Sequence, residues 1–461
     1  MPGKIRKAWP AACAVTGVNL KSLKLRVYKI VVRVADKIGV GQELGRIIAI
    51  PLYRNAFYLM LNTAVTSFFG FFFWMIIARF YSETEVGYGS AAISAINLIT
   101  VLSMLGMSSS IIRFLSQSDR PRDLINSVLT MGGLISLIVA AIFVAGLDFW
   151  SPALSFIKQN VIFALAFLVT AMLSTLSPLL DSVFVARRRA NLVLVRGTIF
   201  SLLKVPLPIV LAGFFHTFGV VASWGVALGI SLLICLFLFL PRIESGYSPV
   251  PTLSLSHLKV IRGYSGSSYL AGLLSVAPAM ILPLMVVNIL GTESNAYFYI
   301  AFMIANLLHA IPYSVSRSLF AEGSYLQKNI KENVMGCLKF IFLLLIPALI
   351  VLLVAGKWVL LAFGQGYATN ALRLLWLFSL SSLPCGIISI YIALLRVQYR
   401  LKEMVLIRGF TAVAELGLSF LAMSVYGIIG IGYAWLGVEV VVAVALAIRL
   451  RTGAGMFSRS E

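Results

Sequence analysis

Two carboxylates inside long apolar runs are the residues of this sequence best placed for chemistry. Glu415 and Glu439 each lie about eleven residues from the ends of their runs, which is about 16 Å deep at about 1.5 Å per residue of helix. Ionised groups at that depth in a membrane are costly and usually functional. The pair is therefore a candidate for proton or cation coupling, unless Arg373 or Arg408 neutralises one of them.

A lysine inside another apolar run is the second candidate. Lys204 stands next to Pro206 and Pro208, which interrupt a helix and free backbone carbonyls nearby. A cation at this depth either binds an anionic ligand or forms a pair within its own helix bundle.

Three arginines lie at the ends of apolar runs. Arg113 and Arg317 are expected on the same side, where two guanidinium groups can hold a pyrophosphate by paired hydrogen bonds. Anchoring of the helix ends explains the same two positions equally well. Arg79 is expected on the opposite side, where it contacts cargo or a gate, or pairs with Glu83 or Glu85.

Amides and a histidine complete the candidate binding residues. Asn306 and Arg317 are eleven residues apart, so they lie on nearly the same face of a helix. Such side chains suit the hydroxyl groups of a sugar, although they also serve as hydrogen-bonding contacts between membrane helices. The uncharged candidates are Asn62, Asn97, Asn306 and His309.

The composition limits what can surround these residues. Charged residues make up 11 % of the chain, against about 25 % in a soluble protein. Hydrophobic residues make up 60 %, and the mean hydropathy is +0.98. These values predict an all-α integral membrane protein, because a lipid-exposed backbone must satisfy its own hydrogen bonds.

Twelve apolar stretches are long enough to span a bilayer of about 30 Å. The expected spans are 57–80, 88–112, 124–147, 160–181, 192–214, 219–240, 264–289, 294–318, 334–355, 370–394, 404–424 and 428–448.

The basic residues predict the orientation of these spans. The formal net charge is +21, and 32 of the 37 Lys and Arg residues fall on the side that holds both termini. An excess of this kind marks the cytoplasmic side, which predicts a multi-pass protein of the cytoplasmic membrane with both termini inside. The basic residues lie between apolar runs, so no nucleic acid is expected as a partner. The sequence contains no Gly-Lys-Ser phosphate loop and no cysteine spacing for a metal, so no cofactor or metal is expected.

The chain divides into four expected parts. Residues 1–50 form a basic cytoplasmic extension, in which Leu20–Gly39 reads as an amphipathic helix on an anionic leaflet or as a solvated tail. Spans 1–6 occupy an N-lobe at 51–245, spans 7–12 a C-lobe at 246–449, and a short tail follows at 450–461. Tyr88, Asn97 and Leu98 recur as Tyr297, Asn306 and Leu307, at an offset of 209 residues. Parallel repeats of this kind are found in transporters.

Several motifs resemble one family. The run Ala78–Ala91, with Arg79, Glu85, Gly87 and Gly89, resembles the junction after the first span of polysaccharide (O-antigen-type) flippases. The segments Leu105–Gly106, Ile112–Phe114 and Leu124–Ser127 follow as in that family. The run Phe363–Leu375, with Gly364, Gly366 and Tyr367, resembles the entry to its tenth span.

This resemblance, which covers about residues 50–450, implies a V-shaped transporter of the multidrug/oligosaccharidyl-lipid/polysaccharide exporter superfamily. It implies transfer of lipid-linked glycan precursors, as in lipopolysaccharide or O-antigen export, through a cationic cavity bordered by spans 1, 2, 7 and 8. It also implies a cation site among spans 7, 11 and 12 in some relatives. We expect no enzymatic activity, a monomer, and glycan-assembly enzymes and membrane lipids as partners.

Two alternative functions remain open. A cation-coupled multidrug antiporter of the same superfamily favours acidic residues in the first spans, where this chain has none at mid-depth. A membrane glycosyltransferase or polymerase needs a catalytic acid on the outer side. Glu83, Glu85, Asp148 and Glu293 are there, but in connections too short to build a sugar-binding site.

Overall fold

The computed structural model describes residues 51–253, 266–323 and 330–452. The predicted amphipathic helix at 20–39 lies outside these residues. The chain separates into two units, Met1–Leu61 and Asn62–Glu461, and every contact reported below lies within the second. The described residues are almost entirely helical and contain no strand.

Twelve of the described helical stretches are long and apolar enough to cross a membrane, which confirms the predicted spans. The protein is therefore a multi-pass membrane protein. The helices of the first six spans and their connections are α3 (Pro51–Phe80), α4 (Glu83–Met104), α5 (Met107–Phe114), η1 (Leu115–Gln117), α6 (Pro121–Ala145), α7 (Leu147–Trp150), η2 (Pro152–Leu154), α8 (Phe156–Gln159), α9 (Val161–Ala186), α10 (Ala190–Lys204), α11 (Leu207–Ile234), η3 (Cys235–Phe239) and α12 (Leu240–Ile243).

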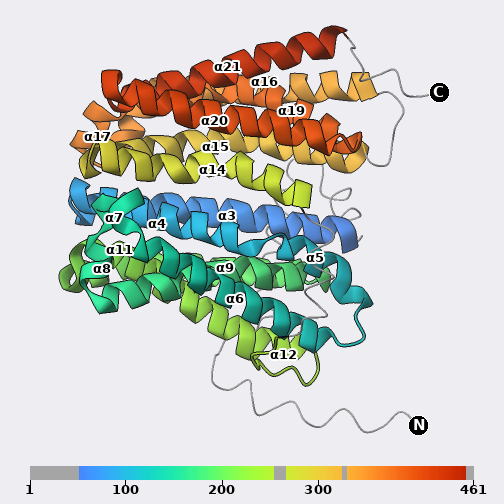
Figure 1. The fold of residues 1–461 in the computed structure, drawn as a ribbon. Coiled ribbons are helices and arrows are strands. Elements are labelled where there is room, and N and C mark those ends of the chain that lie inside the picture. Colours follow the sequence, from blue (N-terminus) through green and yellow to red (C-terminus); the bar gives the residue numbers. More distant parts are fainter. Residues whose placement is uncertain (1–50, 254–265, 324–329, 453–461) are drawn as a thin grey trace, which may run out of the picture. The chain divides into compact units, whose positions relative to one another are not determined.

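The remaining six spans follow after residue 265. Their helices are α14 (Gly266–Ile289), α15 (Thr292–Gly323), α16 (Ile330–Leu361), α17 (Gln365–Asn370), α18 (Leu372–Leu380), α19 (Ser382–Val397), α20 (Leu401–Tyr426) and α21 (Ile428–Thr452). Short helices mark the two ends of the spans. Helices α7, α8 and α17 lie at one end, and α5 lies at the other (Figure 1). We call these the α17 end and the α5 end.

The 209-residue repeat extends to the helix boundaries. The first residues of α4 and α15, Glu83 and Thr292, are 209 positions apart, and so are the last residues of α3 and α14, Phe80 and Ile289. The sparse sequence identity thus coincides with repeated helix ends, as an internal duplication requires.

Three spans are interrupted. The second span was expected to run to residue 112, but α4 ends at Met104 because Leu105 and Gly106 both take positive φ, at 42° and 77°. The fifth span is interrupted between α10 and α11 at Val205–Pro206, as its prolines predict. The tenth span is interrupted at Ser381, between α18 and α19. Interrupted helices within a membrane are found where a cavity or a polar side chain satisfies the freed backbone groups.

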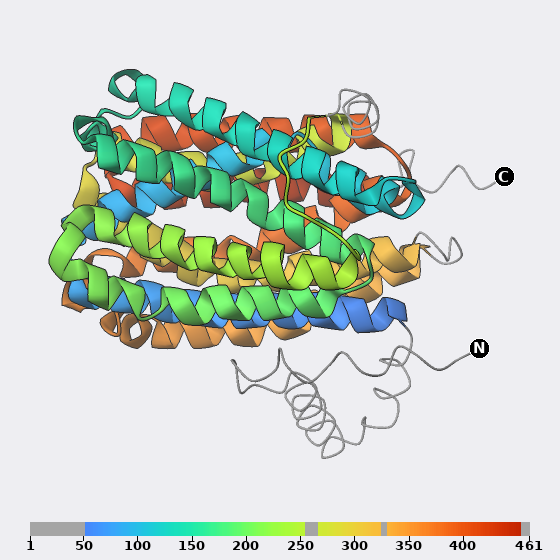
Figure 2. The same ribbon diagram turned by 90° about the horizontal axis from the view of Figure 1, so that it is seen from below.

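Packing joins helices that are distant in the sequence. Helix α4 packs against both α14 and α15, and α14 packs against α20. Helix α3 runs beside α10 (Figure 2), where Asn62 lies against Gly197. A shared hydrophobic core then unites α3 and α4 with α15, α17 and α18.

Candidate functional site

Arg79 joins the C-terminal ends of two helices at the α17 end. Its Nε donates to the carbonyl of Ala362 at 2.8 Å, and its Nη2 donates to that of Leu361 at 2.7 Å. The last carbonyls of a helix lack partners within the helix and carry partial negative charge. Arg79 on α3 therefore caps α16, rather than pairing with either of the two nearby glutamates considered in the sequence.

Those two glutamates have other partners. Glu85 accepts hydrogen bonds from the backbone N–H and the hydroxyl of Ser82, which caps the start of α4. Glu83 accepts a hydrogen bond from the hydroxyl of Tyr297 on α15. A Cβ on Gly366 would lie 1.9 Å from the Glu83 carboxylate, so the glycine allows α17 to approach α4.

The buried Tyr367 belongs to the same cluster. Its side chain is 1 % exposed, and its hydroxyl has no hydrogen-bond partner among the described residues. Burial and the nearby charges of Glu83 and Tyr297 raise the pKa of Tyr367 above its usual value, so it remains a neutral phenol. The residues of the Gly364–Tyr367 motif thus lie at the junction between the two halves of the chain.

Helices α4 and α15 approach closely at this end. A Cβ on Gly87 would lie 1.9 Å from the carbonyl oxygen of Thr292. Asn295 on α15 donates to the Gly87 carbonyl at 2.8 Å and to the Ser90 hydroxyl at 3.0 Å. Gly89 is equally restricted, because its Cβ would lie 2.7 Å from Val220. Small residues allow this approach between membrane helices, which explains the glycines of the Ala78–Ala91 motif.

Aromatic rings fill the space next to these polar contacts. The rings of Trp74 and Tyr299 lie 4.5 Å apart, and those of Phe71 and Phe363 lie 5.1 Å apart. The residues that connect the halves at the α17 end are therefore densely packed, and this end is closed.

Helix α15 is different towards the α5 end, where one face is exposed. Asn306, Ala310, Tyr313, Ser314 and Arg317 follow at helical spacing, and all five are exposed. This sequence of residues places the amide, phenol, hydroxyl and guanidinium along a single stripe. We call it the α15 stripe.

The α15 stripe ends in a group of three arginines. Arg396 on α19 lies within electrostatic reach of both Arg317 and Arg408. Arg396 is hydrogen-bonded to Met404 at 3.4 Å. Like charges on both sides of Arg396 are unfavourable unless an anion is bound near them. The sequence analysis did not propose Arg396, whose position at the end of a span resembles ordinary anchoring.

The two predicted coupling carboxylates lie close to this arginine group. Glu415 on α20 is 3 % exposed and Glu439 on α21 is 6 % exposed. Each is within electrostatic reach of Arg408, and they are within reach of each other. Glu439 Oε2 and Arg408 Nε have no hydrogen-bond partner among the described residues. Arg408 therefore interacts electrostatically with both the arginine group and the two carboxylates.

Sequence spacing carried a signal for Arg408. It lies seven residues before Glu415, so both project from one side of α20. Of the two arginines considered as neutralising partners, Arg408 is near the carboxylates, while Arg373 lies at the start of α18 and is exposed. Tyr313 and Cys385 are hydrogen-bonded to each other beside Glu439, a contact that only the packing of α15 on α19 creates.

Lys204 lies in an aromatic cage. Its ammonium group stands 4.9 Å from the ring centroids of both Phe200 and Trp224, and 5.4 Å from that of Phe73. The residue is 3 % exposed, and a Cβ on Gly70 would lie 3.8 Å from its Nζ. Cation–π contacts stabilise a desolvated cation. Lys204 is thus enclosed by α3, α10 and α11.

The other predicted polar residues are in different surroundings. Asn62 packs on α10, with its Oδ1 unpaired among the described residues, and Asn97 is half-buried on α4. His309 is 5 % exposed, and its Nε2 lies 3.2 Å from the Ser381 hydroxyl at the interruption of the tenth span. It is therefore buried against α18–α19 beside the stripe, three residues from Asn306 and four from Tyr313. Arg113 is exposed on α5 at the opposite end from Arg79.

A buried ion pair was absent from the sequence predictions. Arg196 on α10 donates from Nε and Nη2 to the two carboxylate oxygens of Asp181 on α9, at 2.7 and 2.6 Å. A lone aspartate within an apolar span was the available signal. The paired geometry satisfies both charges within the first half, which indicates a structural role.

One cavity on the surface between the halves is apolar. It has a volume of about 510 Å³ and lies among α4, α6, α14 and α20, with Leu98, Phe143 and Met285 in its lining. Its lining contains none of the candidate arginines.

Residues 76–372 match the model of a family described as polysaccharide biosynthesis protein. That match covers more than half of the chain. The chain belongs to this family. No curated protein sequence matches it.

Solved structures show the same fold as this family member. One is the lipid II flippase MurJ in an inward closed conformation, with a TM-score of 0.69, 14 % identity, and coverage of 86 % of this chain and 87 % of that one. Another is a multidrug resistance MATE transporter in an inward-facing conformation, with a TM-score of 0.65, 14 % identity, and coverage of 87 % and 99 %. A third is a MOP superfamily transporter from Pyrococcus furiosus, with a TM-score of 0.58, 15 % identity, and coverage of 87 % and 95 %. The predicted fold class, an all-α membrane protein with about twelve spans, is confirmed, and its fold is similar to that of these MOP superfamily transporters.

Proposed function

We propose that this family member moves lipid-linked oligosaccharide or polysaccharide precursors from the cytoplasmic to the outer leaflet by alternating access. The observation that carries the proposal is the α15 stripe, a polar face on a membrane-spanning helix that ends at Arg317, Arg396 and Arg408. Membership of a polysaccharide biosynthesis family supports a glycan as the cargo. The fold of a lipid II flippase supports a lipid-linked form of it.

The chemistry of such a cargo explains the need for this surface. Each unsatisfied polar group costs several kcal/mol in hydrocarbon. Sugar hydroxyl groups can exchange their water for the amide and hydroxyl groups of Asn306, Tyr313 and Ser314. The phosphate groups of the cargo can bind the arginines, for which guanidinium groups are well suited. The lipid tail stays in the bilayer at an opening between α3 and α15.

Transport requires the contacts at the α17 end to break. The bonds from Arg79 to α16, from Tyr297 to Glu83 and from Asn295 to α4 all join the two halves. A charge-assisted hydrogen bond contributes about 1.5–3 kcal/mol. A small number of such bonds is therefore enough to keep this end closed and still allows it to open. In this proposal Arg79 is a gate residue, and the half-buried or buried Asn62, Asn97, Lys204 and His309 line or support the route.

Ion coupling follows from the position of Arg408. A phosphate bound at the arginine group attracts Arg408 and weakens its hold on Glu415 and Glu439. The two carboxylates then bind a proton or a cation more readily. Cargo and coupling ion thus affect each other's affinity through one shared charge, which is the thermodynamic meaning of coupling.

The remaining features follow the sequence expectations. We propose that both termini are cytoplasmic, which places the α5 end inside and the α17 end outside. The protein acts as a monomer in the cytoplasmic membrane and works beside glycan-assembly enzymes. Arg113 lies at the inner mouth, where phosphate enters.

The proposal is tested with full-length protein in proteoliposomes that contain a fluorescent polyprenyl pyrophosphate oligosaccharide. Dithionite quenching of the outer leaflet reports the rate of flipping. Arg317→Ala and Arg408→Ala should each lower the rate by about tenfold or more, because one lost charge-assisted contact amounts to about 1.5–3 kcal/mol. Arg188→Ala is the matched control, since Arg188 is an exposed arginine in another connection at the same end.

Unchanged flipping in both variants, at equal reconstitution, contradicts the cationic route. Efflux of organic cations by the wild-type protein, without flipping of the glycan lipid, instead supports the antiporter alternative.

A further inference from the structure

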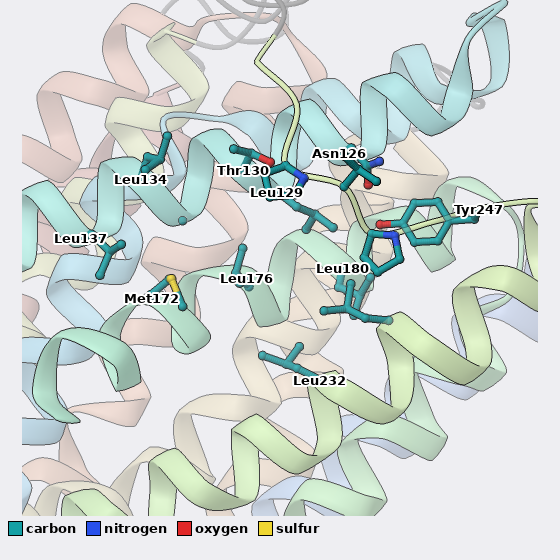
Figure 3. A pocket seen from close by; sticks show the side chains of 15 residues that line it. Asn126, Leu129, Thr130, Leu134, Leu137, Met172, Leu176, Leu180, Leu232 and Tyr247 are labelled. Carbon is teal, nitrogen blue, oxygen red and sulfur yellow. The ribbon is translucent and has the colours of Figure 1, made fainter. Parts of the chain in front are cut away.

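A second cavity, of about 330 Å³, lies in the first half and away from the α15 stripe. Its walls come from α6, α9 and the end of the sixth span (Figure 3). Leu134, Leu137 and Met172 lie at one end of the cavity, and Asn126 and Tyr247 lie at the other. The cavity is therefore a slot between membrane-spanning helices, with an apolar end and a polar end.

The polar end is built by the segment 244–253, which crosses α6. Asn126 donates to the carbonyl of Ser248 at 2.9 Å, and the N–H of Thr252 donates to the hydroxyl of Thr130 at 3.2 Å. Arg122 binds the carbonyl of Ser245. These bonds hold the segment over the slot as a strap, so the cavity has a defined wall on this side.

Tyr247 has an unused hydroxyl at this polar end. Its side chain is 6 % exposed, and its hydroxyl has no hydrogen-bond partner among the described residues. An unpaired buried hydroxyl is unfavourable, so a group that accepts its hydrogen bond is expected. Burial raises the pKa of Tyr247 to about 12, so it stays a donor at neutral pH.

The opposite wall of the slot contains a π-helix. The segment Cys235–Phe239 forms η3, and Leu236 from it lines the cavity. Single π-turns inside α-helices are frequent at functional sites, because they displace side chains from the regular helical positions.

Positive charge surrounds the polar end. Arg120 and Arg122 are exposed at the start of α6, and Arg242 is exposed two residues before the strap begins. Arg187 is paired with Glu244, and Asp123 lies in the first turn of α6, so the local acids neutralise only part of this charge. The arrangement favours an anionic ligand.

We propose that this slot binds an anionic phospholipid of the bilayer, with one acyl chain along Leu134, Met172 and Leu176 and the phosphate near Tyr247 and Arg122. A bilayer lipid is the expected occupant because membrane-spanning helices form the walls. Hydrocarbon outside the slot is as apolar as its lining, so burial alone does not drive binding. Selectivity must then come from the headgroup, and the proposal is independent of the transported cargo.

The test uses full-length protein in phosphatidylcholine nanodiscs with a phosphatidylglycerol probe that carries a photoreactive diazirine on one acyl chain. After irradiation, peptide mass spectrometry should locate the probe on residues 129–137 and 172–180. A phosphatidylcholine probe with the same chains should label these peptides about fivefold less, since one basic residue near a membrane surface is worth about 1 kcal/mol for an anionic lipid.

Gly133→Phe should fill the slot and abolish this labelling. A Cβ at Gly133 would lie 3.5 Å from Met172, so the added side chain enters the cavity without a backbone collision. Ile138→Phe is the matched control, because Ile138 is exposed on the same helix outside the lining. Tyr247→Phe keeps the ring and removes only the hydroxyl, and it should reduce the preference for phosphatidylglycerol. Thermal unfolding in detergent verifies that each variant is folded.

Three results overturn the proposal. Equal labelling of wild-type protein and Gly133→Phe excludes the slot as the site. Equal labelling by the two probes excludes an anionic headgroup as the determinant. Displacement of the probe by polyprenyl phosphate at equal concentration assigns the slot to the tail of the cargo rather than to a bilayer lipid.

Discussion

The two sides along which the halves of the chain meet differ in how they are held. On the α4–α14 side, hydrogen bonds occur near both ends. Asn288 contacts Ser151 and the N–H of Ala153, while the Tyr269 hydroxyl donates to the carbonyls of Val101 and Leu102 at 2.9 and 3.1 Å. On the α3–α15 side, the described contacts lie towards the α17 end, at Trp74, Tyr299 and Arg79. Among the described residues, only the second side combines a closed end with an exposed polar stripe.

This difference indicates where a lateral opening between the two halves can form. Two helices that are hydrogen-bonded to each other near both ends, with apolar packing between, resist separation along their whole length. A seam held at one end can widen at the other through a small rotation, as a hinge does. We therefore expect the α3–α15 side to open first.

Chemical labelling should give the largest contrast between the two ends. In a variant without native cysteines, Ser314→Cys on the α15 stripe should react rapidly with a water-soluble maleimide. Ser90→Cys, which replaces a fully buried serine near the α17 end, should remain unlabelled. Mass spectrometry of the folded protein measures both reactions. Equal labelling at the two positions would show that the ends do not differ.

Gly87→Ala should be the most destabilising single substitution at the closed end. The new methyl group would lie 1.9 Å from the Thr292 carbonyl oxygen, so α4 and α15 must move apart. Overpacking of this kind costs about 1–3 kcal/mol, seen as a lower unfolding temperature in detergent. Gly272→Ala on α14 is the control, because its Cβ meets no atom within 4 Å. Equal unfolding temperatures for the two variants would contradict the close approach.

Arg79→Gln should shift the closed end towards the open state. The substitution removes charge-assisted bonds of about 1.5–3 kcal/mol to the end of α16. Spin labels on α3 and α16 should then show a broader distance distribution by pulsed electron resonance. Arg373→Gln, an exposed arginine at the start of α18, should leave the distribution unchanged. A distribution identical to wild type in Arg79→Gln would rule out its role as a gate.

Tyr269→Phe should have the smallest effect, on the α4–α14 side. The loss of one shared hydroxyl hydrogen bond costs about 0.5–1.5 kcal/mol. Spin labels on α4 and α14 should report little separation, because apolar packing along these helices persists. A large separation in this variant would reverse the comparison, since it would make this side the weaker one.

The helices of this protein were predictable because their cause is local. A run of about 20 apolar residues forms a membrane helix whatever its neighbours are, so all twelve spans were located. The interruption at Pro206 was likewise visible in the sequence. The break at Leu105–Gly106 was missed by the span prediction, since apolar residues continue across it and only the backbone angles stop the helix.

The site was predictable only in part, because its contacts join side chains on different helices. The expectation that Asn306 and Arg317 share a helix face needed only the helical period, and both are exposed on α15. The burial of His309 against Ser381 depends on how α15 packs beside the tenth span. The roles assigned to Glu415, Glu439 and the arginines stay predictions until transport is measured.

The amino-acid sequence alone determined the membrane class, the number of spans, the repeat and the motif glycines, because hydropathy and local backbone preferences act over short distances. Tertiary structure alone decided that Arg79 caps α16, that Arg408 lies between arginines and carboxylates, and that Tyr247 lacks a partner. In each case the deciding partner is on another helix, and the free energy of such a contact depends on an approach that no single segment specifies.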